Sequence, residues 1–160
     1  MKVTLAKVVL IVLLSFSTTL SAAASKEAMK LINEAKKEAG EIKAQKLMEM
    51  VEDEEDVIVL DVREAKQRSE GLPYVNEITP IAIQQVTRGN LEFFIDKKIK
   101  NRDAVIVTFC RSGGRGALSA QTLKHLGYKN AVNLKGGLKG WTKAGYPVKL
   151  GFGVVKLAKE

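Results

Sequence analysis

Short apolar segments alternate along the chain with segments whose apolar residues recur at helical spacing. The apolar, β-branched runs at 57–60 and 104–109, and a third that begins at 131, are typical of buried strands. Helical periodicity occurs at 44–51 and again at 117–126. Because strands that alternate with helices form parallel sheets covered on both faces, we predict an α/β fold with a mostly parallel central sheet.

The N-terminal residues have the three parts of a secretory signal peptide. Lys2 and Lys7 supply a basic start, 8–14 form an apolar run, and 21–24 are small residues. The apolar run is shorter than the roughly 20 residues of a membrane-spanning helix, which disfavours the alternative of an uncleaved anchor. No cysteine follows it directly, so a lipoprotein is excluded. We predict cleavage near Ala24 and a periplasmic or secreted protein.

The remainder of the chain is predicted to form one domain with short extensions. Residues 25–40 carry lysines and glutamates around one modest apolar stripe, which indicates a surface helix ahead of the domain. Its predicted role is a solvated extension, with a dimer contact as the alternative. The domain is assigned to 41–150 and a C-terminal tail to 151–160, after a signal peptide at 1–24.

The charge of the protein favours small anions as partners. The 160-residue chain has a formal net charge of +8, and removal of the signal peptide takes away two lysines and no acidic residue, which lowers it to +6. No basic motif is interleaved with aromatic residues, so nucleic acid is not an expected partner. His125 is the only histidine and no metal-ligand cluster is evident, so neither a metal nor an organic cofactor is expected.

The single cysteine, Cys110, lies between the predicted strand 104–109 and the predicted helix 117–126. Free backbone N–H groups at the start of a helix converge on negative charge, so this loop is expected to hold an anion at the Cys110 sulfur. Nearby arginines favour the thiolate. A buried inert thiol and an intermolecular disulfide are the alternatives, but neither explains the flanking residues. The loop residues predicted to bind substrate are Arg111, Ser112, Gly113, Gly114, Arg115 and Gly116.

Four motifs in this order resemble a single-domain rhodanese, a sulfurtransferase. They are Asp61-Val62-Arg63-Glu64, the Cys110 loop, Gly127-Tyr128, and the segment 133–147 with Gly136-Gly137, Trp141 and Pro147. The resemblance covers about 42–148 and implies a rhodanese-like sheet of about five strands. It further implies that Cys110 becomes a persulfide, which carries sulfane sulfur from thiosulfate or polysulfide to cyanide, sulfide or a thiol.

The resemblance also implies roles for individual arginines. Arg115 matches the last position of the family loop and is the first candidate for binding the donor anion, because a planar guanidinium suits oxyanions. Arg111 either contacts the anion or points to solvent. Arg63 matches a family position that rings the site, and its alternative role is a salt bridge that fixes the loops. Asp61 is expected to orient such a partner and not to act as a general base.

Two further segments bear on the resemblance. Residues 86–93 look like the Arg-Gly-x-Leu-Glu element of exported single-domain rhodaneses, including periplasmic polysulfide-sulfide transferases, which makes Arg88 a further candidate for the anion site. A homodimer is expected on the same ground. Residues 71–76 depart from the Gly-His-Ile-Pro-Gly-Ala pattern of many rhodaneses, so any role of that histidine is absent here.

Other functions were weighed against sulfur transfer. A cysteine phosphatase or arsenate reductase needs Cys-x5-Arg, whereas Arg115 gives Cys-x4-Arg and Gly116 occupies the phosphatase position. Ser112 has no nearby histidine to activate it, which excludes a serine triad. A non-catalytic carrier that delivers polysulfide sulfur to a membrane-bound reductase would form the same persulfide, and the sequence leaves this alternative open.

Overall fold

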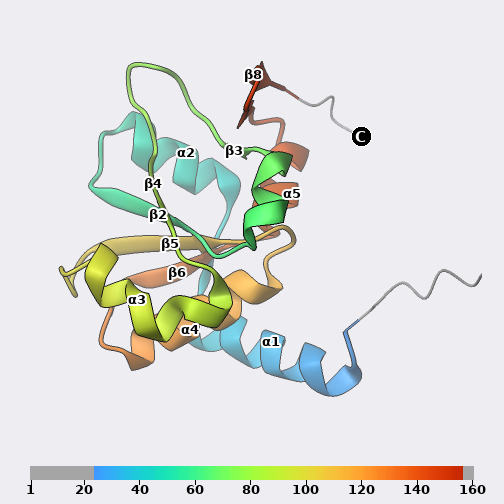
Figure 1. Ribbon diagram of the computed structural model, residues 1–160, viewed down its shortest axis with the longest axis vertical. Helices are drawn as coiled ribbons and strands as arrows, with labels where there is room; N and C mark the ends of the chain where they lie inside the picture. The colour runs from blue at the N-terminus through green and yellow to red at the C-terminus, as the bar shows by residue number, and fades with distance from the viewer. Residues whose placement is uncertain (1–23, 157–160) are drawn as a thin grey trace, which may run out of the picture.

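The computed structural model describes residues 24–156, and its centre is a five-stranded sheet (Figure 1). The predicted signal peptide lies outside the described residues except for Ala24. All neighbouring strands of the sheet are parallel, which confirms the predicted α/β fold. The strand order is β1 (Glu41–Ile42), β6 (Ala131–Leu134), β5 (Val105–Phe109), β2 (Val57–Asp61) and β4 (Ala82–Gln85).

Helices cover both faces of this sheet, as predicted (Figure 1). On one face lie α2 (Ala44–Glu52) and α5 (Gly137–Lys143), which share a hydrophobic cluster with alternate residues of β2 and β5. On the other face lie α3 (Leu91–Lys98) and α4 (Gly114–His125), whose cluster includes Cys110. Apolar residues on both sides of each central strand explain why these strands read as unbroken apolar runs.

The N-terminal extension forms a helix, α1 (Lys26–Ala39), that packs along α4. It begins at Ser25, whose hydroxyl oxygen accepts a hydrogen bond from the Ala28 N–H at 3.1 Å. Ala35 and Ala39 are buried against the rest of the protein, and small side chains there permit close approach. The extension predicted as a solvated helix therefore has one fully packed face.

A second, three-stranded antiparallel sheet was not predicted. It consists of β3 (Leu72–Pro73), β7 (Val148–Leu150) and β8 (Gly153–Val155), so β8 lies in the segment assigned to a tail. Strands of two or three residues are too short to show a period of two.

Two 3₁₀ helices, η1 (Ala65–Glu70) and η2 (Arg88–Asn90), follow the carboxyl ends of β2 and β4.

The register of the sheet brings two of the motifs to one edge. Asp61 at the end of β2 pairs with Phe109 at the end of β5, and the Val62 N–H donates to the Phe109 carbonyl at 3.0 Å. Because both strands end here, Arg63 and Cys110 leave the sheet side by side.

Within 24–156, no helix has the length and apolar character needed to cross a membrane.

Candidate active site

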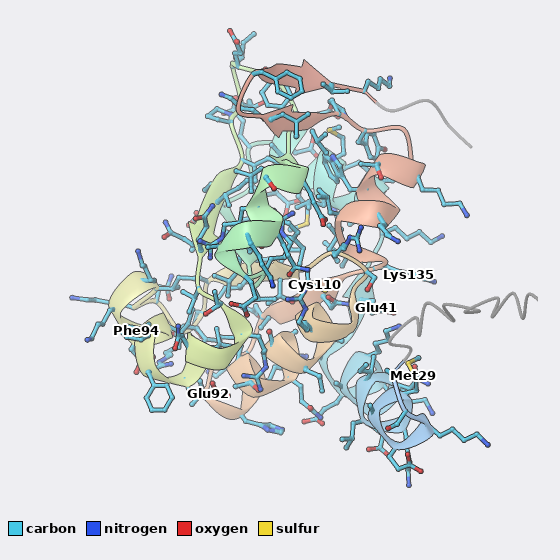
Figure 2. All side chains as sticks on the ribbon, turned by 45° about the vertical axis from the view of Figure 1, so that its right-hand side comes forward. Met29, Glu41, Glu92, Phe94, Cys110 and Lys135 are labelled. Atoms are coloured by element: carbon cyan, nitrogen blue, oxygen red, sulfur yellow. The ribbon has the colours of Figure 1, made fainter. Side chains whose placement is uncertain are left out.

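Cys110 follows β5 directly and is 2% exposed (Figure 2). Its Sγ accepts a hydrogen bond from the Gly113 N–H at 3.2 Å. Gly113 has a φ of 93°, in the left-handed region that glycine adopts without strain, and it caps the N-terminus of α4. The sulfur therefore lies at the positive end of a helix, where negative charge is stabilised.

The helix after the cysteine begins earlier than predicted, at Gly114 instead of 117. Its first interior hydrogen bond runs from the Ala117 N–H to the Gly113 carbonyl, so the amides of 114–116 belong to the first turn. First-turn amides have no partner within their own helix. The adjoining glycines have no apolar side chain that could extend the periodicity on which the prediction depended. The amides that we predicted to bind an anion lie in this first turn.

The N-terminus of α5 is hydrogen bonded to the backbone of the Cys110 loop. The Leu138 N–H donates to the Cys110 carbonyl at 2.8 Å, and the Lys139 N–H donates to the Arg111 carbonyl at 3.0 Å. This contact requires Gly137, because a Cβ there would lie 2.3 Å from the Cys110 carbonyl oxygen. The Gly136-Gly137 pair of the fourth motif is thus a contact point for the loop.

Two arginines belong to the loop itself. Arg115, the first candidate for binding the donor anion, is partly buried in the first turn of α4. Arg111 is about half exposed, and its Nε lies 3.1 Å from an oxygen of Glu70. Of the four arginines predicted for the site, Arg115 is the one without an acidic partner among residues 24–156. Its charge is therefore available to an anion.

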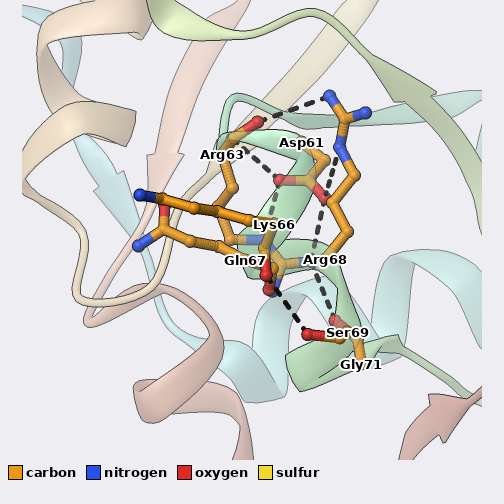
Figure 3. Close-up of polar contacts among 7 residues, drawn as sticks. All are labelled: Asp61, Arg63, Lys66, Gln67, Arg68, Ser69 and Gly71. Atoms are coloured by element: carbon orange, nitrogen blue, oxygen red, sulfur yellow. Dashed lines mark hydrogen bonds and ion pairs between the residues drawn. The ribbon is translucent and has the colours of Figure 1, made fainter.

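Arg63 is completely buried and hydrogen bonded through all three guanidinium nitrogens (Figure 3). Its Nε and Nη2 donate to the two oxygens of Asp61 at 2.9 and 2.8 Å. It also donates to the carbonyls of Gln67 and Gly71, and it lies 5.0 Å from the centre of the Phe109 ring. This geometry favours the structural role over the predicted substrate contact, and places Asp61 as the orienting partner.

Arg88 is not brought to the Cys110 loop. Its Nη1 pairs with Glu92 at 2.9 Å and its Nη2 donates to the Thr122 hydroxyl at 3.1 Å. Thr122 is eight residues beyond Gly114, which places it about 12 Å along α4 from the loop. The predicted contact of Arg88 with the bound anion is therefore not supported, because its guanidinium binds a more distant turn of the helix.

Three charged residues near the loop were missed from the sequence. Glu70 lies at the end of η1 and pairs with Arg111. Lys135 and Lys139 are exposed and flank the glycines that touch the loop. Nothing in the sequence indicated that 135–139 contacts the cysteine loop.

No three His, Cys, Asp or Glu side chains of the described part are grouped to hold a metal ion.

Comparison with known proteins bears on this geometry. Residues 43–144 match the family described as the Rhodanese-like domain. A sulfurtransferase of Allochromatium vinosum is 31% identical over 108 residues, which are 68% of this chain and 92% of that protein.

Two solved structures are similar as well. The homodimeric polysulfide-sulfur transferase of Wolinella succinogenes has 25% identity and a TM-score of 0.62, with 74% of this chain and 84% of that chain covered. A rhodanese-related protein of Thermoplasma volcanium has 31% identity and a TM-score of 0.53, with 69% of this chain and 97% of that chain covered. The resemblance found in the sequence is thereby confirmed, and the chain belongs to the rhodanese-like family.

Proposed function

We propose that this protein is an exported sulfurtransferase that moves sulfane sulfur from thiosulfate or polysulfide to a thiophilic acceptor through a persulfide on Cys110. Membership in the rhodanese-like family and the sulfurtransferases among its relatives support sulfur transfer as the activity. The observation that carries the proposal is the hydrogen bond from the Gly113 N–H to the Cys110 Sγ at the N-terminus of α4.

The first half-reaction loads the cysteine. The Cys110 thiolate attacks the outer sulfur of thiosulfate, the S–S bond of the donor breaks, and sulfite leaves with the bonding electron pair. With polysulfide, a shortened polysulfide leaves instead. The product carries its negative charge on the terminal sulfur of the persulfide, where the amides of the first turn of α4 would stabilise it.

The second half-reaction returns the thiolate. Cyanide, sulfide or a thiolate attacks the terminal sulfur, and the electron pair of the broken S–S bond returns to Cys110. Arg115 would neutralise the entering donor anion, since its guanidinium has no acidic partner in the described range. The small exposure of Cys110, 2%, favours a small sulfur anion over a bulky substrate.

Location and partners are further parts of the proposal. The signal-peptide pattern at 1–24 supports a periplasmic or secreted protein. A homodimer is supported by the dimeric polysulfide-sulfur transferase among the similar structures. The acceptor would be a membrane-bound sulfur reductase or a small thiol.

Steady-state kinetics test the proposal against the alternative of a sulfur carrier. The protein is incubated with thiosulfate or polysulfide and cyanide, and thiocyanate is measured over many equivalents of protein. Continued production of thiocyanate supports a transferase. A carrier would instead take up one sulfur atom per protein molecule and stall without its partner, with no thiocyanate released. The R115K variant keeps the charge but loses the planar fork, and we expect its kcat/KM to fall by about tenfold or more. An unchanged kcat/KM would contradict the role of Arg115.

A further inference from the structure

We propose that Ile32 is a positioning residue for the Cys110 loop, which makes the N-terminal helix part of the active-site framework. Helix α1 ends at Ala39, whereas the match to the family begins at residue 43. The inference deepens the proposed sulfur transfer and rests on it for one of its two readouts. The other readout is independent of any activity.

The contact is made at the residue that opens α4. Gly114 has no side chain, and the position that a Cβ would take there is 3.3 Å from Cδ1 of Ile32 and 3.8 Å from its Cγ1 and Cγ2. The aliphatic side chain of Ile32 therefore lies against the backbone of Gly114. The preceding residue, Gly113, donates its N–H to the Cys110 sulfur. Ile32 thus contacts the residue that directly follows Gly113, whose amide contacts the reactive sulfur.

Helix α1 packs along α4 through the buried Ala35 and Ala39, so this contact is not that of a loose terminus. The Glu38 carboxylate pairs with His125 and accepts a hydrogen bond from Gln121, both at 2.5 Å. These residues are in the second half of α4, whereas Ile32 contacts its first residue. The middle and the C-terminal end of α1 therefore contact the two ends of α4. Directly after it, the Gly40 carbonyl accepts a hydrogen bond from the Asn133 N–H in the central sheet.

The loop has two supports of different kinds. Helix α5 holds the Cys110 and Arg111 carbonyls, at the start of the loop, by hydrogen bonds. Ile32 supports Gly114, at the end of the loop, by packing. Adjacent glycines have more backbone freedom than other residues, so Gly113 and Gly114 depend on their surroundings for position. Without Ile32, the Gly113 N–H would lose its fixed direction toward the sulfur.

Substitution of Ile32 tests this role, with Leu31 as the matched control. Ile32→Ala removes all three atoms near Gly114, and Ile32→Val removes Cδ1, the nearest, but keeps both Cγ atoms. Leu31→Ala removes the same number of carbon atoms from a neighbouring side chain that is 59% exposed. The first readout is amide hydrogen exchange of 110–116, compared with that of β6. The second is kcat/KM for transfer of sulfur from thiosulfate to cyanide.

For Ile32→Ala we expect exchange of 110–116 to become about tenfold faster with β6 unchanged, and kcat/KM to fall by about tenfold, because small misplacements near a reacting atom are costly. Ile32→Val should recover both values to within about twofold, and Leu31→Ala should match the parent within the same margin.

Equal acceleration of amide exchange throughout the protein would overturn the proposal, since α1 would then stabilise the whole domain. Faster loop exchange with unchanged kcat/KM would also overturn it. If the parent transfers no sulfur, the proposed function fails, while local exchange still decides whether Ile32 holds the loop.

Discussion

Substitution of Gly137 by alanine tests whether α5 holds the Cys110 loop in place. The added Cβ would lie 2.3 Å from the Cys110 carbonyl oxygen, 2.9 Å from the Gly113 nitrogen and 3.0 Å from the Arg111 carbonyl carbon. All three atoms belong to backbone, which cannot rotate away as a flexible side chain can. Because ordinary contact begins near 3.4 Å, loop and helix must separate by about 1 Å.

The expected energetic cost has two parts. Gly137 has a φ of 58°, and an alanine in the left-handed region costs about 1 kcal/mol. Separation also breaks the 2.8 Å hydrogen bond from the Leu138 N–H to the Cys110 carbonyl, which contributes about 1 kcal/mol. The free energy of unfolding should therefore fall by about 2 kcal/mol or more. Since a 1 Å misplacement can cost about 100-fold in rate, kcat/KM should fall by about that factor.

Gly127→Ala is the control that separates strain from displacement. Gly127 also has a positive φ, 92°, but nothing lies within 4 Å of the position of its Cβ. The control should lose about 1 kcal/mol of stability in urea denaturation and keep its kcat/KM. If Gly137→Ala and Gly127→Ala lose the same stability and activity, the reasoning about the contact between α5 and the loop is refuted.

Two further substitutions test the ion pairs. Arg63→Gln removes the hydrogen-bonded cation of the buried Asp61 carboxylate and leaves it only Arg68, whose Nε is 3.9 Å away. The free energy of unfolding should fall by about 3 kcal/mol in urea denaturation, whereas a loss below about 1 kcal/mol would contradict the buried role. The hydrogen bond from Gln121, and then that with His125, holds the pKa of Glu38 below its ordinary value of 4.5. The carboxylate therefore stabilises the protein above about pH 4.5, and this contribution is lost as the pH falls through the lower folded value. Thermal unfolding between about pH 3 and 6 should show a smaller acid-dependent loss for Glu38→Gln than for the parent, and superimposable pH profiles would refute the link.

Local sequence features predicted three strands of the central sheet, β2, β5 and β6, because buried parallel strands are continuous apolar runs, whereas the short strands β1 and β4 were not predicted. The run at 57–60 and the run at 104–109 both proved to be central strands, the latter beginning one residue later. Their shared edge placed Arg63 beside the Cys110 loop. The expectation that Asp61 orients a neighbouring cation agrees with its two hydrogen bonds from the Arg63 guanidinium.

Contacts between distant segments could not be predicted in this way. The sequence shows Ile32 as one residue of an apolar stripe, and nothing in that stripe indicates that it faces Gly114. The direction of a long side chain is equally hidden. Arg88 lies in η2, directly before α3, and it reaches Thr122 only because α3 and α4 cover the same face of the sheet. Such details depend on packing between elements, which periodicity within one element does not encode.

The central claim is that Cys110 carries sulfur as a persulfide, and intact mass spectrometry tests it most directly. The reduced protein and a Cys110→Ser variant are incubated separately with thiosulfate or polysulfide, and their masses are recorded before and after addition of cyanide or sulfide. We predict that the parent gains the mass of one sulfur atom, that the acceptor removes it, and that the variant gains none. If neither donor adds sulfur to the parent, or if the variant is loaded equally, sulfur transfer through Cys110 is contradicted.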